Sequence, residues 1–168
     1  QVDVRPTTGD VLFKTNLVDQ VKFMYAWIGS NYTKVERTAT WDYLQAFVDE
    51  ARKQGLRIHA AINTFVGGNQ IDGGTGLLYR DQSKAEWATQ MNMQVGITSV
   101  MNTSESTKFF NPAHPEVQTF LCDLLKDLAG YDLDGIFLDR GRFLNLQADF
   151  SEESRKQFEE YLDQMCSI

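Results

Sequence analysis

Residues 134–143 read DGIFLDRGRF, and this stretch decides the fold. An Asp-Gly turn leads into three apolar residues, which is the pattern of a short buried strand over residues 135–139. The strand ends on an acid, Asp139, and Arg140 and Arg142 follow it. A buried strand that ends in a cluster of charges indicates either a structural ion pair or a functional site.

The stretches on either side predict alternating strands and helices. VDVRP at residues 2–6 and LRIHAAIN at residues 56–63 predict two more strands. Apolar residues recur at helical spacing over residues 40–55, 114–130 and 151–165. Strands that alternate with helices form βα units, so the chain is predicted to be an α/β protein with a parallel sheet and its helices on one side.

Capping residues mark the ends of the predicted helices. Thr40 is the expected N-cap of the first helix and Gly55 its C-terminal stop, while Ser151 is the expected N-cap of the third. The apolar stripe of the third helix consists of Phe158, Tyr161, Leu162 and Met165. Cys122, inside the apolar run FLCDLL, is expected to be a small core residue.

Two long segments carry weaker signals. Residues 10–39 and 64–84 are predicted to be loops, and GGNQIDGGTG at residues 67–76 reads as a flexible surface loop. A glycine-rich stretch after a strand can also bind phosphate, but no clear helix follows this one directly. Residues 87–101 fit either a hairpin or one additional strand.

Composition excludes several classes of protein. The 168 residues are 42% hydrophobic, which predicts a single folded domain over residues 1–168. The net charge of −7 argues against nucleic acid and anionic membrane surfaces as partners, and no apolar run is long enough to insert into a membrane. The two cysteines lack metal-ligand spacing, so no metal and no cofactor are expected.

Polar residues gather where the predicted strands end. Arg5, Asn63 and Asp139 close the three strands, and His59 shares a strand face with Asn63. Asp3 is expected on the same face as Arg5. Because ligands of parallel α/β folds bind at the carboxyl ends of the strands, these ends outline a polar pocket.

Each of these residues also has a structural interpretation. Asp139 could cap a helix or pair with Arg142, and Arg5 could serve only in a salt bridge. His59 could be a core histidine bonded to a carbonyl, and Asn63 could satisfy loop backbone groups. The coincidence at three strand ends favours a functional site.

Several motifs resemble one known family. VRPTTGDVLF, FVDEARKQGLRIHAAIN, FFNPAHPEV, DLDGIFLDRGRF and DFSEESRKQFEEYL occur in the order and spacing of the family-ten glycosyl-hydrolase-like proteins. These are bacterial (β/α)₈ TIM-barrel proteins, distantly related to the α-amylase type of enzyme. The resemblance implies a glycoside hydrolase that acts on O-glycosidic bonds of an oligo- or polysaccharide.

The resemblance also assigns roles to residues. It implies that Asp139 is the catalytic nucleophile and that Arg5, His59, Asn63 and Arg142 bind substrate, with Arg5 holding Asp139 ionised and oriented. Family members often carry a second acid or a tyrosine after the nucleophile and a Tyr-Pro ending, where this chain has Arg140 and Phe-Leu. This departure concerns the sugar contacts more than the nucleophile.

The length predicts a partial barrel. A complete (β/α)₈ barrel needs about 250 residues, so residues 1–168 are expected to cover about half, without the first and the later strands. The acid/base partner of Asp139 would then come from a later strand, and the chain alone is expected to be inactive. Since the chain begins at Gln1 and shows no signal peptide, its start is expected to have been cut.

Two alternatives remain open at this stage. One is a non-catalytic carbohydrate-binding barrel, in which Phe65, Tyr79 and Phe143 would stack on sugar rings as they would in the enzyme. The other is a self-contained α/β interaction domain. A barrel segment would also self-associate through its open sheet edges. The resemblance alone implies an extracellular, periplasmic or cell-surface location.

Overall fold

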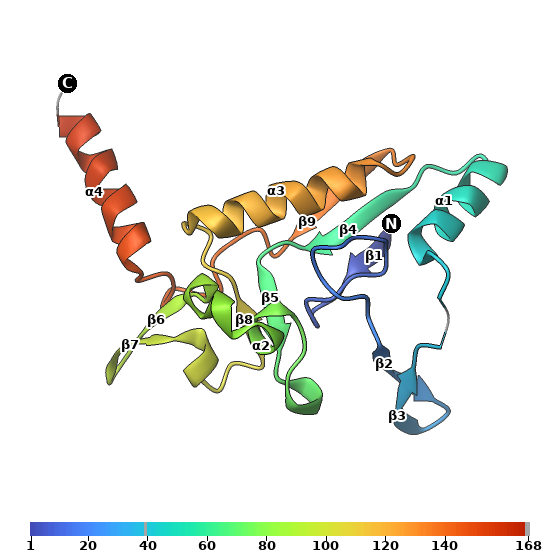
Figure 1. The fold of residues 1–168 in the computed structure, drawn as a ribbon, viewed down its shortest axis with the longest axis horizontal. Coiled ribbons are helices and arrows are strands. Elements are labelled where there is room, and N and C mark those ends of the chain that lie inside the picture. Colours follow the sequence, from blue (N-terminus) through green and yellow to red (C-terminus); the bar gives the residue numbers. More distant parts are fainter. Residues whose placement is uncertain (39, 167–168) are drawn as a thin grey trace.

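The structure, a computed structural model, describes residues 1–38 and 40–166. Its centre is a parallel sheet of three strands, β1 (Val2–Arg5), β4 (His59–Asn63) and β9 (Gly135–Asp139), in the order β1-β4-β9 (Figure 1). The predicted parallel sheet is confirmed, although β4 begins three residues later than the predicted strand at 56–63.

The register of the sheet separates its two faces. Val2 lies opposite Ala60, which in turn lies opposite Ile136, so these three residues share one face. Asn63 lies opposite Asp139, and this pair belongs to the other face at the carboxyl end of the strands. On β4 and β9 the first face is apolar, and the second carries His59, Asn63 and Asp139.

Three longer helices follow the predicted positions. They are α1 (Tyr43–Lys53), α3 (Pro115–Ala129) and α4 (Glu152–Cys166). The N-cap of α1 is Asp42 and not Thr40, because the Asp42 side chain accepts a hydrogen bond of 3.1 Å from the backbone N–H of Gln45. Ser151 caps α4 as predicted, with its hydroxyl oxygen 3.2 Å from the Ser154 nitrogen.

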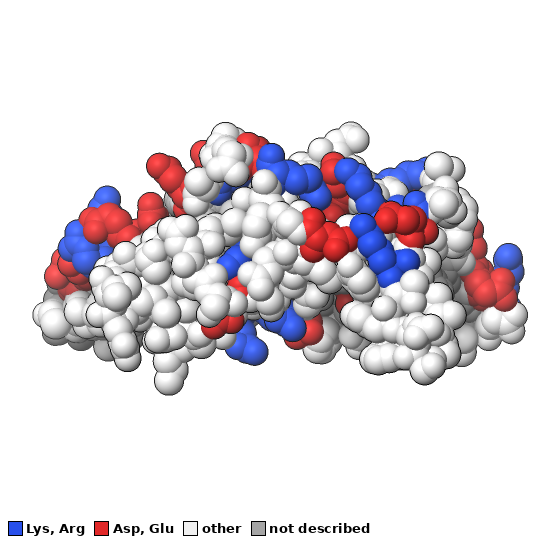
Figure 2. Space-filling model, turned by 90° about the horizontal axis from the view of Figure 1, so that it is seen from below, with Lys and Arg blue, Asp and Glu red and all other residues white. Residues whose placement is uncertain are grey.

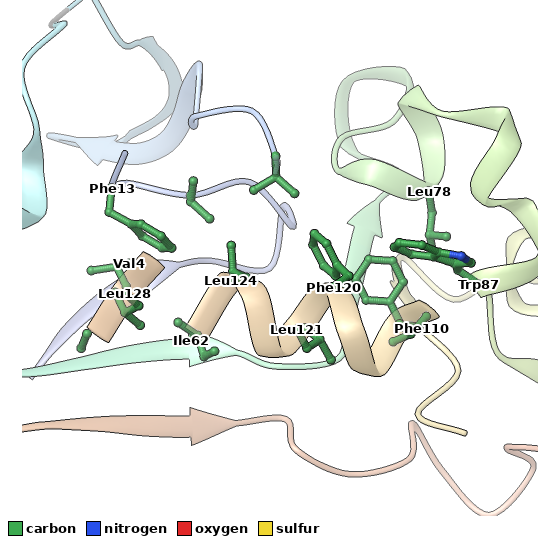
Figure 3. Close-up of a cluster of buried hydrophobic side chains, with 14 of the residues drawn as sticks. Val4, Phe13, Ile62, Leu78, Trp87, Phe110, Phe120, Leu121, Leu124 and Leu128 are labelled. Atoms are coloured by element: carbon green, nitrogen blue, oxygen red, sulfur yellow. The ribbon is translucent and has the colours of Figure 1, made fainter. Parts of the chain in front are cut away.

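The hydrophobic core lies on the apolar face of the sheet. Leu44 and Val48 of α1 belong to the same buried cluster as Val4, Ala60 and Ile62 of the sheet. Figure 3 shows α3 lying along β4 with its buried residues turned toward the sheet and toward a group of aromatic rings. This helix contributes Val117, Phe120, Leu121, Leu124 and Leu128. Both helices therefore bury their apolar sides against one face.

Short antiparallel strands and one short helix lie in the two segments predicted as loops. β2 (Phe23–Ile28) pairs with β3 (Asn31–Glu36), so the prediction of a loop over residues 10–39 is wrong in part. β5 (Val66–Asn69) pairs with β8 (Thr107–Phe109), and α2 (Leu77–Arg80) follows β5. The ambiguous segment at 87–101 contains a hairpin, β6 (Gln90–Met93) with β7 (Gly96–Ser99). Three 3₁₀ turns complete the chain, η1 (Ile71–Gly73), η2 (Gln82–Trp87) and η3 (Val100–Asn102).

The glycine-rich stretch is tightly packed at both ends, and only its middle, with Gln70, Asp72 and Gly73 exposed, is a surface loop. A Cβ added to Gly67 would lie 2.5 Å from a methyl carbon of Leu78, and one added to Gly68 would lie 2.3 Å from the Thr75 carbonyl oxygen. Gly76, at φ 81°, would place a Cβ 2.5 Å from the Cα of Gly68. Glycine is needed here because the backbones of β5 and the turn after it approach too closely for any side chain.

An ion-pair cluster ties α1 to the strands at their amino ends. Arg52 of α1 pairs with Asp132 at 2.7 Å and with Asp134 at 2.8 Å. The Asp134 carboxylate also accepts the backbone N–H of Ile58 at 2.7 Å. One guanidinium therefore links α1 with the segments that lead into β4 and β9.

α4 is tied to the turn before α3 by residues of its first two turns, and the Gln157 amide donates to the Ala113 carbonyl oxygen at 3.0 Å. The Asn111 side chain donates to the Ser151 hydroxyl at 2.9 Å and accepts the Ala113 N–H at 2.9 Å, which ties the beginning of α4 to the turn before α3. The rest of α4 extends away from the sheet and has no buried residue (Figure 1). Cys122 is exposed on α3, so the prediction of a core cysteine is wrong. In the described part of the chain, no helix is long and apolar enough to cross a membrane.

Shortening a core residue of α3 tests this packing. Leu124 is 1% exposed, so Leu124→Ala is expected to lower the free energy of unfolding by about 2–5 kcal/mol through lost burial and a residual cavity. Urea denaturation followed by circular dichroism measures this change. Leu146→Ala is the control, because Leu146 is 99% exposed and its loss should change stability by less than about 0.5 kcal/mol.

Candidate functional site at the carboxyl end of the sheet

Asp139 is the last residue of β9 and is exposed to solvent. It lies on the face of the sheet opposite α1 and α3, which is the open face. Its Oδ1 accepts the backbone N–H of Arg140 at 2.7 Å, and its carbonyl oxygen accepts the N–H of Thr64 at 2.7 Å. Arg140 adopts φ 48°, a left-handed conformation that costs energy for a residue with a side chain. Strain of this kind gathers at functional sites, and here it accompanies the hydrogen bond that orients the Asp139 carboxylate.

Arg5 and Asn63 hold each other at the ends of β1 and β4. The Arg5 guanidinium donates to the backbone carbonyl oxygens of Asn63, Thr64 and Val66. In return, the Asn63 side-chain amide donates to the carbonyl oxygen of Arg5 at 2.8 Å. Both residues are buried, at 0% and 5% exposure, so they fix the backbone of the site.

The expected hydrogen bond from Arg5 to Asp139 is not found. A register irregularity in β1 lies between Asp3 and Arg5, and the buried Arg5 side chain turns toward the end of β4 instead of sharing the exposed face with Asp3. Burial lowers the pKa of Arg5 to about 10, and the charges of Asp10 and Asp3 oppose this fall. Arg5 therefore remains a cation at neutral pH and acts on the loop after β4.

His59 and Arg142 lie at different distances from Asp139 along the sheet. His59 is exposed but pairs with Gly135, so it lies at the amino end of β4, four residues before Asn63. At about 3.3 Å per residue this places it roughly 13 Å along the strand from Asn63. Arg142 is exposed just after β9, and its Nη1 lies 3.2 Å from the carbonyl oxygen of Leu144. The structure thus gathers Arg5, Asn63 and Asp139 at one end and leaves His59 at the other.

Asp3 adds a second carboxylate to the open face. Asp3 is on β1 and lies opposite Ala61 of β4, whereas Asp139 is on β9, the strand that pairs with the other edge of β4. Partial burial raises the pKa of Asp3, the Arg5 N–H lowers it, and the negative charge of Asp139 raises it again. The charge of Asp139 therefore reaches Asp3 across the sheet. The sequence placed Asp3 on this face, but only the register shows that it faces the same side as Asp139.

The raised pKa of Asp3 predicts a stability effect with a definite sign. The folded chain binds a proton at Asp3 more readily than the unfolded chain, so stability falls as pH rises through the titration range of this carboxyl. Asp3→Asn is expected to raise Tm at about pH 7 and to lose this advantage near pH 3, where the wild-type carboxyl is protonated. Thermal unfolding at both pH values measures the difference.

An amide substitution elsewhere provides the control for Asp3→Asn. Asp123 lies on α3, where it pairs with Lys126 at 2.7 Å, so Asp123→Asn tests the effect of removing a carboxylate away from the sheet. An equal gain in Tm from both substitutions at neutral pH would show that net charge, and not the open face, is responsible.

Exposed aromatic rings are spread over the molecule, and two of them, Trp27 and Tyr32, lie on a hairpin that sequence reasoning missed. Tyr79 packs against the glycine-rich turn, and Phe143 is 47% exposed beside the end of β9. The β2–β3 hairpin carries the larger group, Tyr25, Trp27 and Tyr32. Its alternating FMYAW run before a Gly-Ser turn is a hairpin signal that could have been recognised.

Metal binding has no support at this site. No group of three or more His, Cys, Asp or Glu side chains within residues 1–38 and 40–166 could hold a metal ion. Figure 2, a view from below Figure 1, shows acidic and basic side chains beside one another and wide uncharged areas, so this side of the molecule carries no basic footprint.

These features define an α/β protein with a polar site at the carboxyl ends of its parallel strands. The chain matches the family described as glycosyl hydrolase-like 10 over residues 3–166, and it belongs to that family. It is also similar to an S-layer-related protein of Niallia circulans, with 33% identity over 127 residues. That alignment covers 72% of this chain and only 8% of the relative, so the chain spans a small part of the length of that protein.

Proposed function

We propose that this domain acts on O-glycosidic bonds of an oligo- or polysaccharide, with Asp139 as its catalytic carboxylate. The observation that carries the proposal is an exposed, oriented carboxylate at the carboxyl end of a parallel strand in a glycosyl-hydrolase-like chain. Ligands of parallel α/β proteins bind at this end of the sheet.

The proposed architecture is a segment of a (β/α)₈ barrel. Two features support it: α1 and α3 pack on one face of the sheet, and Asp3, Asn63 and Asp139 lie on the opposite face. β1 and β9 each have one edge without a strand partner in the described sheet. In the proposal, strands from other parts of the full-length protein, or from a second copy, pair with these edges.

Asp139 would attack the anomeric carbon of a sugar. A bond forms between its carboxylate oxygen and that carbon, the bond to the leaving-group oxygen breaks, and an acid donates a proton to that oxygen. Water then hydrolyses the glycosyl ester. Oδ1 is held by the Arg140 N–H, and within the described residues no hydrogen bond reaches Oδ2, which is therefore assigned as the attacking oxygen.

The acid that completes the reaction is expected on another strand of the barrel, and Asp3 is the second carboxylate within this sheet. Asp3 lies two strand spacings from Asp139, about 9.6 Å, and its register level is that of Phe137, two residues or about 6.6 Å before Asp139, so the two positions are roughly 12 Å apart. Retaining glycosidases need roughly 5–5.5 Å between carboxyl groups and inverting ones roughly 6.5–9.5 Å. The spacing therefore assigns the acid of either reaction to a different strand.

The remaining site residues take different roles in this proposal. Arg142, exposed after β9, would contact sugar hydroxyls directly. Arg5 and Asn63 are positioning residues, because they are buried and hold the backbone next to Asp139. His59 would reach only a saccharide that extends toward the amino end of the strands.

A non-catalytic carbohydrate-binding domain is the second candidate function. The exposed rings of the β2–β3 hairpin favour it, because they would hold a saccharide whether or not Asp139 cleaves it. A cell-surface location is proposed for either function, on the ground that the similar Niallia circulans protein is named S-layer-related.

Asp139→Asn in the full-length protein tests the catalytic proposal. Asn keeps the size of the side chain but removes the nucleophilic charge, so kcat on an activated aryl glycoside is expected to fall by several orders of magnitude. Thermal unfolding and saccharide affinity should change little, since the residue is exposed. Initial rates, Tm and calorimetric titration measure the three quantities.

Asp123→Asn on α3 is the matched control and should leave kcat unchanged. If Asp139→Asn unfolds the protein, or if it lowers kcat no more than Asp123→Asn does, Asp139 is a structural residue and the assignment fails. A full-length protein that binds saccharides but hydrolyses none would establish the binding function instead.

A further inference from the structure

The β2–β3 hairpin presents aromatic rings on one of its two faces. Trp27 pairs with Tyr32 in the antiparallel register, and Tyr25 pairs with Lys34. Since side chains alternate along a strand, Phe23, Tyr25 and Trp27 share this face with Tyr32. Met24, Ala26 and Ile28 lie on the other face. We call Tyr25, Trp27 and Tyr32 the ring platform.

The rings of the platform lie against one another, with Trp27 and Tyr32 exposed to solvent and Tyr25 partly buried. Tyr25 and Tyr32 are stacked, with centroids 5.3 Å apart and planes 22° from parallel. Trp27 lies on the other side of Tyr32, with centroids 5.3 Å apart and a tilt of 46°. Trp27 is 70% exposed and Tyr32 is 59% exposed. Large apolar groups that gather on a surface in this way mark interaction sites.

Polar contacts hold the platform in place. The Tyr25 hydroxyl donates to Asp72 of η1 at 2.7 Å, and Lys34 pairs with the same carboxylate at 2.7 Å. The Lys34 ammonium also lies 4.2 Å from the centroid of the Phe23 ring. The hairpin is thus fixed to the glycine-rich turn after β5. A platform that is held before ligand arrives loses less entropy on binding.

A cavity of about 360 Å³ connects the platform with the sheet. Its lining includes Tyr25 and Tyr32 from the hairpin, Thr7 and Thr8 from the turn after β1, and Asp3 from β1 itself. This volume lies in the range of small-molecule sites, about 300–1,000 Å³. The wall thus combines aromatic and aliphatic side chains with two threonine hydroxyl groups and one carboxylate from the open face of the sheet.

We propose that the ring platform and this cavity form a saccharide-binding subsite that extends the site at Asp139. The ligand would be a chain of pyranose rings with equatorial substituents, such as a β-1,4-linked glucan or its N-acetylated form. This inference rests on the proposed function, since it names the class of saccharide and where it binds.

The chemistry of the surface fits such a sugar. A pyranose with equatorial hydroxyls presents flat C–H faces, which pack on aromatic rings, and hydroxyls at its rim, which bond to polar side chains. Asp3, Thr7 and Thr8 supply such groups in the cavity. Nucleic acid bases also stack on aromatic rings, but their phosphates need a basic groove, whereas Lys34 is already paired with Asp72 and the net charge is −7.

Binding of cellohexaose and chitohexaose to the full-length protein tests the inference. Trp27→Ala and Tyr32→Ala are each expected to weaken binding of at least one of these hexasaccharides about tenfold, with loss of Trp27 also removing the fluorescence change on binding. Ile28→Ala is the matched control, because Ile28 is 58% exposed on the opposite face of the same hairpin. Calorimetric titration measures affinity, and Tm reports the fold.

Several outcomes would overturn the inference. These are no binding of either hexasaccharide by the wild type, unchanged affinity in both ring variants, or an equal loss in Ile28→Ala. If the ring substitutions instead abolish self-association in sedimentation experiments and leave saccharide affinity unchanged, the platform is a protein interface. The failure of this inference can be told apart from the failure of the proposed function. If Asp139→Asn loses hydrolysis but Trp27→Ala keeps its saccharide affinity, only the role of the platform is rejected. If binding depends on the rings but the protein hydrolyses no saccharide, only the catalytic role of Asp139 is rejected.

Discussion

The buried guanidinium of Arg5 is the constraint on which the carboxyl end of the sheet depends. No carboxylate is bonded to it in the described structure; its hydrogen bonds go to the backbone carbonyl oxygens of Asn63, Thr64 and Val66. Removing a cation from water costs several kcal/mol unless its donors are satisfied, so these carbonyl oxygens must stay in place. One side chain from β1 thus fixes the path of the chain as it leaves β4.

The position of Asp139 follows from this arrangement. The Thr64 N–H, in the segment that Arg5 holds, donates to the carbonyl oxygen of Asp139 at 2.7 Å, and so couples the end of β9 to the end of β4. The Arg140 N–H then orients the carboxylate. The Asp139 side chain therefore has a fixed direction, because its backbone is linked through the end of β4 to the buried Arg5 guanidinium of β1, two strands away.

The two faces of the sheet have different roles. The face with Val4, Ala60 and Ile62 buries apolar surface under α1 and α3 and supplies the stability of the fold. The other face leaves Phe137 half exposed and places Asp3 and Asp139 within electrostatic reach of each other. Like charges that are kept on one face reduce stability, and such a cost is typical of functional sites.

The sequence by itself determined the regular elements with strong periodicity. The apolar spacing of residues 114–130 predicted α3 closely, and alternation with short apolar runs predicted the parallel sheet, because local side-chain spacing follows helix and strand geometry. The motifs indicated the family. Because the carboxyl ends of parallel strands meet at one edge of the sheet, the sequence also predicted that Arg5, Asn63 and Asp139 lie at the same end. The β2–β3 hairpin was missed although the FMYAW run and the Gly-Ser turn after it carried a local signal for it.

The tertiary structure alone decided what each polar side chain does. Arg5 was expected to hold Asp139, but an irregularity between Asp3 and Arg5 turns it toward β4, and local spacing cannot reveal such a shift. The glycine-rich stretch was expected to be flexible because glycine is permissive, yet contacts with Leu78 and Thr75 make its ends close-packed. Register, burial and long-range contacts arise between segments far apart in the chain, and therefore only the folded molecule specifies them.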